Sequence, residues 1–308
     1  MGNIDYFIGV DVSKNSLSVC ILFGDTKNYF EIANEKSEIL KFFAMYGNLK
    51  SYAAFENTNT YNYDLMRAFD ELGLPYARLD AFKFSHFLRH NSRLKTDKMD
   101  SYAIALYAKK FHDELETGKF DEEMVLIKSY QSALTLINKI NNQLSNFNDA
   151  LQNVGNESVE RSFKRLINNL EIEKKELENQ IYEYIKKLIP ETEMILAENK
   201  GLSKMFAIYV LPLIYINRAR KANQIACYMG LVPFAKESGI SLKGGAHISG
   251  GARLARRALF MSSLSICRYH PFFSEKYNAL VKRGKAKNVA HLAICRKIVI
   301  YIKRKYFN

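Results

Sequence analysis

Apolar and polar positions alternate in short runs over the first third of the chain. These runs have the length and the aliphatic and aromatic content of β-strands, and they lie at 6–11, 17–23, 29–32, 52–56 and 76–79. Apolar residues spaced three and four apart predict helices at 37–46 and 63–72, and again in the stretch from Tyr102 to Ala108. The order βββαβαβα predicts an α/β domain that begins with an antiparallel meander.

The pattern becomes helical from residue 121 to residue 190. One apolar stripe runs from Ile137 to Leu151 and a second from Phe163 to Leu188, each with spacings of three and four. The break at 154–156 predicts a long antiparallel helical hairpin or coiled coil that stops at Pro190. Such an arm either dimerises or covers its own stripe within one chain, and we favour dimerisation.

Charge is divided unevenly along the 308 residues, whose net charge is +13. Residues 201–308 hold 20 Lys and Arg against 2 Asp and Glu, a net charge of +18, whereas residues 1–200 hold 25 against 30, a net charge of −5. The mostly helical C-terminal third is therefore expected to bind a polyanion, with nucleic acid as the default partner. We predict three domains: an α/β domain at 1–120, a helical arm at 121–190 and a basic helical domain at 191–308.

The sequence predicts no membrane span, no disulfide and no metal bound by thiols. No apolar run approaches the length of a membrane span, and Asp5 and Asp11 interrupt the first segment. The cysteines form no CxxC pair and are expected to be reduced core residues of a cytoplasmic protein; they are Cys20, Cys227, Cys267 and Cys295. His86 and His90, spaced i and i+4 on an expected helix, lack a third ligand nearby, which favours a solvated or DNA-facing pair.

Four carboxylates are the candidate catalytic residues. Asp11 and Glu56 each stand where an apolar strand ends, and Asp97 and Asp100 lie three apart, on one face of a helix's first turn. A ribonuclease-H-like fold would bring such acids to one end of a sheet, where they would repel one another unless a cation held them. Oxygen ligands suit Mg²⁺ or Mn²⁺, which indicates a metal-dependent phosphoryl-transfer site. The alternative for each acid by itself is a helix cap.

A segment rich in glycine and serine lies at 232–251, between two helical runs of the basic region. Such a loop can approach a phosphate backbone closely, and a basic helix follows it at once. The alternative is a surface loop whose serines serve turns alone. The candidate nucleic-acid-binding residues here are Lys236, Lys243, Arg253, Arg256 and Arg257.

Six motifs together resemble the DEDD insertion-sequence transposases, whose relatives include the Piv-type DNA invertases. In the N-terminal part the resemblance lies in Ile8-Gly9-Val10-Asp11-Val12-Ser13-Lys14, Phe55-Glu56-Asn57-Thr58-Asn59-Thr60-Tyr61 and Lys95-Thr96-Asp97-Lys98-Met99-Asp100-Ser101. In the C-terminal part it lies in Tyr228-Met229-Gly230-Leu231-Val232-Pro233, Glu237-Ser238-Gly239-Ile240-Ser241 and Arg256-Arg257-Ala258-Leu259-Phe260-Met261. The chain departs from the family at Asn199-Lys200-Gly201-Leu202, where many members have a helix-hairpin-helix turn, and at Gly251-Ala252, where Gly-Asn is usual.

The resemblance implies a RuvC-like nuclease domain whose metal-binding acids match Asp11, Glu56, Asp97 and Asp100. It also implies a C-terminal transposase domain whose nucleophilic serine matches Ser238, and a coiled-coil arm that builds homodimers and then homotetramers. In family members a structured RNA from the element pairs with donor and target DNA, so the resemblance implies double-stranded DNA and a guide RNA as partners. Localisation in the cytoplasm, on the nucleoid when DNA is bound, follows from this expectation.

The expected reaction is strand exchange through a covalent phosphoserine. A serine hydroxyl is a poor nucleophile at neutral pH, and no His adjoins Ser238 in sequence, with His247 the nearest helper. Activation is therefore expected from Mg²⁺ at the acidic cluster. No GxxxxGK[ST] loop is present, in keeping with an exchange that conserves bond energy.

Four other functions compete with transposition. A site-specific invertase of the same family would use the same chemistry, and a hydrolytic RuvC-like nuclease would use water as the nucleophile. An actin-like kinase shares a strand that ends Gly-x-Asp, but its later phosphate motifs are not matched by 244–245 and 250–251, which lie among Lys and Arg. A DNA-binding protein without activity would leave the clustered acids unexplained.

Overall fold

The computed structural model describes residues 4–47, 49–57, 59–91, 97–151, 155–233, 237–238, 242–243, 248 and 250–308. These residues divide into two compact units, 1–122 and 123–308. The predicted division into three domains stays a prediction.

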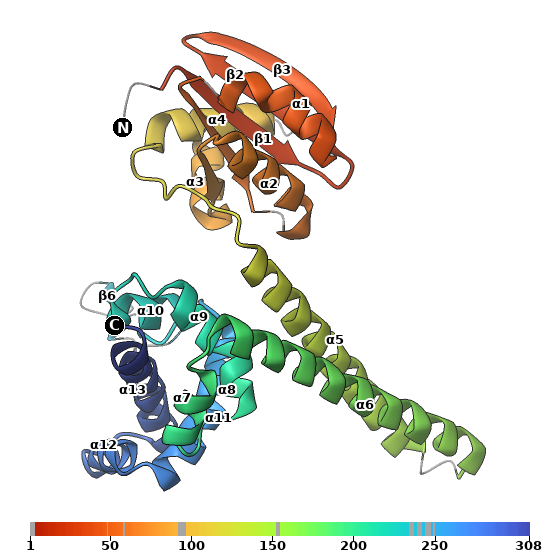
Figure 1. Cartoon of the computed structure of the whole chain (residues 1–308), viewed down its shortest axis with the longest axis vertical. Coiled ribbons are helices and arrows are strands. Elements are labelled where there is room, and N and C mark those ends of the chain that lie inside the picture. The colour runs from red at the N-terminus through yellow and green to blue at the C-terminus, as the bar shows by residue number, and fades with distance from the viewer. Residues whose placement is uncertain are drawn as a thin grey trace. The chain divides into compact units, whose positions relative to one another are not determined.

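The first unit is built on a five-stranded mixed sheet of order β3-β2-β1-β4-β5 (Figure 1). The strands are β1 (Tyr6–Val12), β2 (Ser16–Phe23), β3 (Thr26–Ala33), β4 (Ser51–Glu56) and β5 (Tyr76–Leu79). The first three pair antiparallel, as the expected meander requires, whereas β1 pairs with β4 and β4 with β5 in parallel. The mixed α/β architecture predicted for this part is confirmed.

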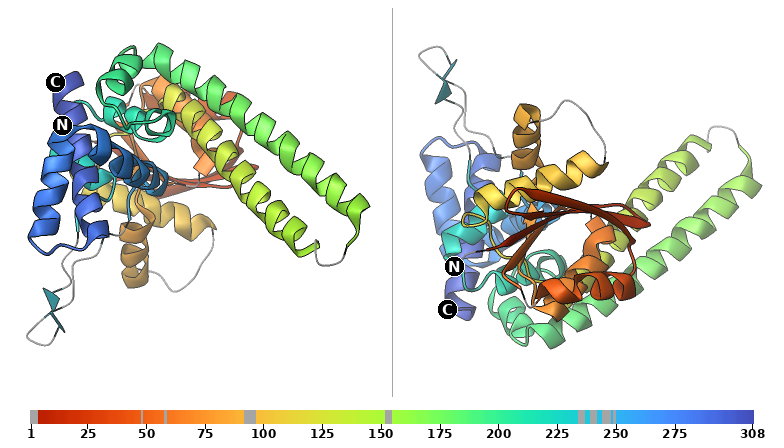
Figure 2. Two further views of the ribbon diagram at one scale, coloured as in Figure 1. Left: turned by 90° about the horizontal axis from the view of Figure 1, so that it is seen from below. Right: turned by 90° about the horizontal axis from the view of Figure 1, so that it is seen from above.

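Helices cover both faces of this sheet (Figure 2). The helices are α1 (Lys36–Gly47), the short η1 (Asn59–Asn62), α2 (Tyr63–Leu72), α3 (Ala81–Asn91) and α4 (Asp97–Phe111). On one face, Phe43 of α1 and Phe55 of β4 both contact Phe69 of α2. On the other, residues of α3 and α4 join a core with Phe7 and Tyr52. Because both faces are covered, β1 and β4 are almost continuously buried.

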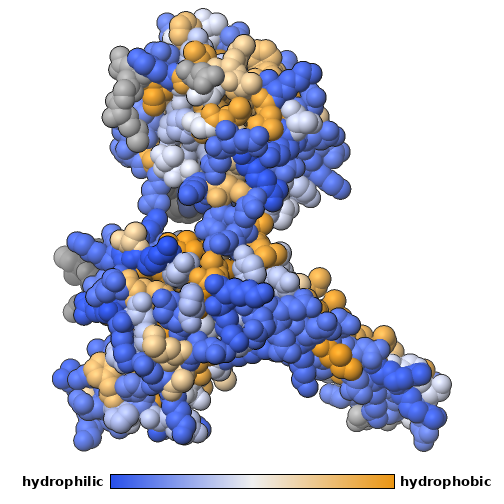
Figure 3. Space-filling model, in the orientation of Figure 1, coloured by the Kyte–Doolittle hydropathy of each residue, from blue (hydrophilic) through white to orange (hydrophobic). Residues whose placement is uncertain are grey.

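The second unit begins with two long helices, α5 (Glu122–Leu151) and α6 (Glu157–Leu188). They run antiparallel, since Phe147 contacts Phe163 and Tyr130 donates a hydrogen bond to Gln180. Near the base, Ile127 and Ile181 enter the core of the second unit. Farther along, large apolar side chains remain exposed on the surface of the pair, among them Leu136, Leu166 and Ile172 (Figure 3). A helical hairpin is thus present, and a coiled coil that dimerises stays a prediction.

The rest of the second unit is a helical bundle, as expected for the basic C-terminal third. Its elements are α7 (Thr192–Glu198), α8 (Lys204–Tyr209), α9 (Leu211–Ile216), α10 (Ala222–Tyr228), β6 (Glu237–Ser238), β7 (Leu242–Lys243), α11 (Arg253–Tyr269), α12 (Pro271–Lys282) and α13 (Lys287–Tyr306). Helix α13 is central, because Ile294, Ile298 and Ile302 are fully buried in the core that α8, α10 and α11 share. Among the described residues, none of the helices combines the length and the apolarity that spanning a bilayer requires.

One glycine decides how closely α4 packs on the sheet. A Cβ at Gly9 of β1 would collide with the backbone of Ser101 and would lie 2.9 Å from the Cα of Ala105. Backbone atoms of a helix cannot turn aside as a flexible side chain can. Only glycine therefore allows β1 and α4 this approach.

We expect Gly9→Ala to destabilise the chain by about 3 kcal/mol or more, because α4 must move off the sheet. Gly24→Ala is the control: it has φ of 58° but nothing within 4 Å of its Cβ, so only about 1 kcal/mol of backbone strain is expected. Thermal unfolding of both variants measures the difference, and equal midpoints would show that the contact is not a constraint.

Candidate active site at the end of the first strand

Two of the predicted acids lie side by side at one end of the sheet. Strands β1 and β4 are parallel, and Val10 pairs with Phe55 in their register. Asp11 and Glu56 come next on the two strands, so they occupy neighbouring positions at the carboxyl edge. Both side chains are half-buried. Acids separated by 44 intervening residues thus come together through strand pairing alone.

Helix α4 runs antiparallel to β1 and brings its first turn toward the same edge. Its C-terminal end lies over the start of β1, where the ring of His112 is 5.2 Å from that of Phe7. One to two turns from its start, Ser101 and Ala105 lie against Gly9. Helix α4 begins at Asp97, one turn before Ser101, and Asp11 lies two residues after Gly9 on β1. Since a helical turn and two strand residues span about 5.4 Å and 6.6 Å, these positions approach each other.

The donor chemistry of these four positions fits a hard divalent cation, because carboxylate oxygens are the ligands that Mg²⁺ and Mn²⁺ prefer. Asp100 is half-buried in the first turn of α4, and the side chain of Asp97 lies outside the described residues. The described side chains, which exclude that of Asp97, include no group of three His, Cys, Asp or Glu that could hold a metal. Strand pairing places Asp11 beside Glu56, while the assignment of the four acids as ligands of one ion stays a prediction.

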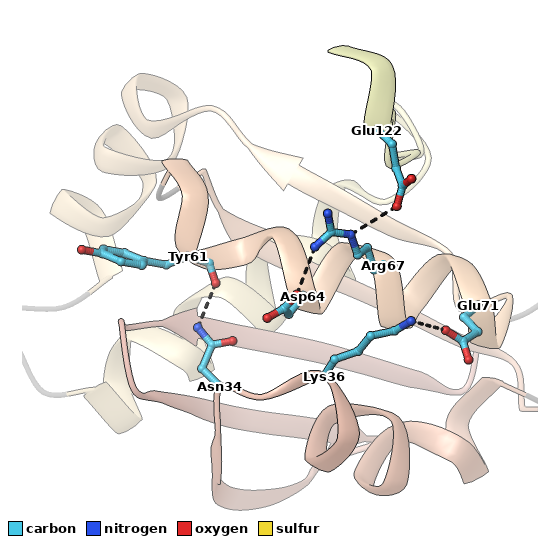
Figure 4. A network of polar contacts seen from close by, with 7 residues as sticks. All are labelled: Asn34, Lys36, Tyr61, Asp64, Arg67, Glu71 and Glu122. Carbon is cyan, nitrogen blue, oxygen red and sulfur yellow. Dashed lines mark hydrogen bonds and ion pairs between the residues drawn. The ribbon is translucent and has the colours of Figure 1, made fainter. Parts of the chain in front are cut away.

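Asn34 ties together the two loops that leave this edge, and the sequence did not single it out. Its side-chain nitrogen donates a hydrogen bond to the carbonyl oxygen of Ser13, two residues after Asp11, at 2.8 Å. The same nitrogen donates to the carbonyl oxygen of Tyr61, five residues after Glu56, also at 2.8 Å (Figure 4). One amide thus links the chain beyond Asp11 with the chain beyond Glu56. In the sequence Asn34 directly follows the third strand, but the two carbonyl oxygens that accept its hydrogen bonds can be identified only from the structure.

We expect Asn34→Asp to lower the stability of the chain by about 1–2 kcal/mol, because it keeps the shape but replaces both N–H donors with oxygen. Asn28→Asp makes the same chemical change at an exposed position on β3 and should have little effect. Thermal denaturation of the two variants provides the comparison. A midpoint for Asn34→Asp no lower than that of Asn28→Asp would contradict the linking role.

The predicted serine loop contains a short hairpin. Glu237 pairs with Lys243 and Ser238 with Leu242, which places Ser238 on β6. The side chains of Ser238 and Lys243 lie outside the described residues, as do Lys236 and His247 entirely. Their predicted roles therefore stay predictions.

The two stems of this loop cross in close backbone contact. A Cβ at Gly251 would lie 2.5 Å from the nitrogen of Gly230, and both glycines have positive φ, 67° and 71°. Arg256 spans the crossing: its guanidinium donates hydrogen bonds to the carbonyl oxygens of Gly250 and, at 3.3 Å, of Met229. At least part of its donor capacity is thus directed at the protein. Arg253 and Arg257, on the first turns of the same helix α11, are exposed.

We expect Arg256→Gln to destabilise the chain by about 1–3 kcal/mol, since the carbonyl oxygens of Met229 and Gly250 lose a charged hydrogen-bond donor. Arg253→Gln, the matched control, should leave stability unchanged. It should instead lower the number of counterions released on DNA binding by about one, which is read from the slope of log affinity against log salt concentration. Thermal unfolding and DNA affinity against salt concentration separate the two effects. If Arg256→Gln changed the salt slope but not the unfolding midpoint, a DNA contact would explain Arg256 better.

The four cysteines differ in burial: Cys20 and Cys295 are buried, Cys267 is partly buried and Cys227 is exposed. Burial raises the pKa of the Cys20 and Cys267 thiols to about 11 and that of Cys295 to about 12, so these groups stay protonated at neutral pH. Cys227 differs from the expectation of a core residue, because it lies exposed near the end of α10. His86 lies on α3, as expected, and the side chain of His90 is outside the described residues.

Comparison with known proteins covers both units. Residues 8–154 match the DEDD transposase model of the IS110 type, and residues 193–278 match the transposase IS116/IS110/IS902 family. The chain is also similar to the pilin gene-inverting proteins of Moraxella lacunata and Moraxella bovis. It is 24% identical to each over 318 aligned positions, which cover 95% of this chain and 93% of each relative. Nuclease domains of the DEDD type are typically dependent on divalent metals.

Proposed function

Because the chain belongs to the DEDD insertion-sequence transposases of the IS110 type, we propose that it cuts and rejoins DNA at the carboxyl end of β1, with Ser238 as the nucleophile. DNA recombination in general follows from the family. The roles of individual residues are the proposal. Asp11, Glu56, Asp97 and Asp100 hold the divalent cation, Mg²⁺ or Mn²⁺, and Ser238 forms the covalent link.

The observation that supports this assignment best is the parallel pairing of β1 with β4. It sets Asp11 beside Glu56 at the edge toward which the first turn of α4 is directed. A structural cap needs one acid at one helix end, whereas here two acids from neighbouring parallel strands stand side by side. When bound, a divalent cation would supply positive charge against the scissile phosphate and its leaving oxygen.

Each step of the proposed reaction forms one phosphorus–oxygen bond and breaks another, so no further reactant is needed. The hydroxyl oxygen of Ser238 forms a bond to phosphorus while the bond from phosphorus to a deoxyribose oxygen breaks, and that oxygen takes up a proton. In the second step a deoxyribose hydroxyl of the new partner attacks the phosphoserine, and the serine hydroxyl is regenerated. Phosphodiester energy is kept in the protein-DNA link, which agrees with the absence of an ATP-binding motif from the sequence.

Assembly and guidance complete the proposal. The basic side chains near the serine loop, namely Lys236, Lys243, Arg253, Arg256 and Arg257, contribute to DNA binding, with Arg256 also holding the loop stems. The paired helices α5 and α6 form a coiled coil that joins two chains, and two dimers form a tetramer on paired DNA. A structured RNA encoded beside the gene selects the sites, as in family members.

Inversion is the second candidate, because the two relatives that align along nearly the whole chain are named for inverting a pilin gene. The same residues would act, and the DNA flanking the gene separates the two outcomes. Element ends beside a non-coding stretch support transposition, and a flanking invertible segment supports inversion. Hydrolysis by water is the third candidate, and it would leave no covalent intermediate.

We expect Ser238→Ala to abolish the covalent protein-DNA adduct and to lower recombination on the order of a thousandfold or more, because the attacking oxygen is lost. Ser241→Ala, in the same loop, is the matched control and should retain the adduct. The assay supplies element DNA and RNA with Mg²⁺ and resolves adducts on a denaturing gel. An adduct formed by Ser238→Ala would refute the nucleophile, and cleavage without any adduct would favour hydrolysis.

A further inference from the structure

Tyr61 is an exposed aromatic residue close to the acidic edge that neither the fold nor the proposed chemistry requires. It lies in η1, five residues after Glu56, and its side chain is 47% exposed. In Figure 4 its ring extends away from the polar network that holds its backbone. A ring that is nearly half exposed leaves one face accessible to a ligand.

The position of Tyr61 is fixed relative to the strand that carries Asp11. Its carbonyl oxygen and that of Ser13 accept hydrogen bonds from the same nitrogen of Asn34, each at 2.8 Å. The two oxygens therefore lie no more than twice that distance apart. Since Ser13 is two residues beyond Asp11, the carbonyl oxygen of Tyr61 is held within about three to four residue lengths of the acid.

The residues that follow Tyr61 anchor it on the other side. Asn62 is only 1% exposed, and the ring of Tyr63, which begins α2, contacts that of Phe120 at 5.7 Å. The ring of Tyr61 thus projects from a segment fixed at both ends. A platform held in this way loses little conformational freedom when a ligand covers it.

Charge gives a reason for an aromatic contact at this edge. Residues 1–122 hold 15 Lys and Arg against 18 Asp and Glu, so the unit has no basic excess with which to attract phosphates. Stacking on a nucleobase does not depend on net charge, and each stacked base contributes enough to matter in single-stranded binding. A ring that entered an intact duplex would first have to separate stacked bases, which costs a few kcal/mol.

We propose that Tyr61 is a stacking site for an unpaired nucleobase of DNA next to the phosphate at the acidic edge, with Asn34 as the residue that positions it. This inference rests on the proposed function, because it takes the acidic edge as the place where DNA is cut. The ligand class is DNA with an unpaired or splayed base beside the cut. Fully paired duplex is not a ligand of the Tyr61 ring, because a base would first have to be unstacked at a cost of a few kcal/mol.

The test uses the full chain without divalent metal, so that binding is measured in the absence of cleavage. The probe is a DNA duplex with a single-stranded branch that carries 2-aminopurine, whose fluorescence reports stacking. Wild type and Tyr61→Phe should bind it alike and quench it, whereas Tyr61→Leu should bind roughly five- to 150-fold more weakly and not quench it. Affinity for fully paired duplex should be the same in all three.

Tyr29→Leu is the matched control, since Tyr29 is 39% exposed on β3, two strands from β1, and its removal should change neither affinity nor quenching. Unfolding midpoints equal to wild type establish that each variant is folded. If Tyr61→Leu bound and quenched the branched probe as wild type does, the stacking site would be refuted. If Tyr61→Phe instead bound as weakly as Tyr61→Leu, the contact would belong to the phenol hydroxyl, and stacking would equally be refuted.

Asp11→Asn separates this inference from the proposed function. If both hold, Asp11→Asn loses recombination but still quenches the probe in a Tyr61-dependent way. If Asp11→Asn recombines normally while Tyr61→Leu loses quenching, the catalytic assignment fails and a nucleobase site at Tyr61 remains.

Discussion

The contact between α4 and β1 at Gly9 is the constraint on which the first unit depends. Because a helix backbone lies directly on a strand there, α4 can take only one position along β1. The antiparallel direction then sets the first turn of α4 toward the edge where β1 and β4 end. Packing thus shapes the candidate active site: sheet pairing sets Asp11 beside Glu56, and the absence of a side chain at position 9 lets α4 lie directly on β1.

The proposed chemistry is divided between two units of opposite character. The first unit supplies acids at a rigid sheet edge, whereas the second supplies basic helices and a loop whose hairpin carries Ser238. The stems of that loop are held by a glycine crossing and by Arg256, so the loop leaves the bundle from a fixed point. In the proposed reaction the nucleophile and the metal-binding acids come from different units, so cleavage would require both units to reach the same phosphate.

Local patterns predicted most of the elements, because strand alternation and helical spacing are properties of neighbouring residues. The strand expected at 6–11 is β1, and the helical runs on either side of residue 154 are α5 and α6. The parallel pairing that brings Asp11 to Glu56 was accessible through the order of elements. Residues that act across the fold were not: Asn34 bonds to carbonyls 21 and 27 residues away, and Arg256 spans two loop stems. Composition alone placed Cys227 in the core, whereas it is exposed.

If the four acids share one divalent ion, electron paramagnetic resonance should detect one tight Mn²⁺ site on each full-length chain. That site should be weakened alike by Asp11→Asn, Glu56→Gln, Asp97→Asn and Asp100→Asn, and unaffected by Asp25→Asn in the turn between β2 and β3. Mn²⁺ affinity that did not change in the four variants, or that changed in only one of them, would contradict a shared site.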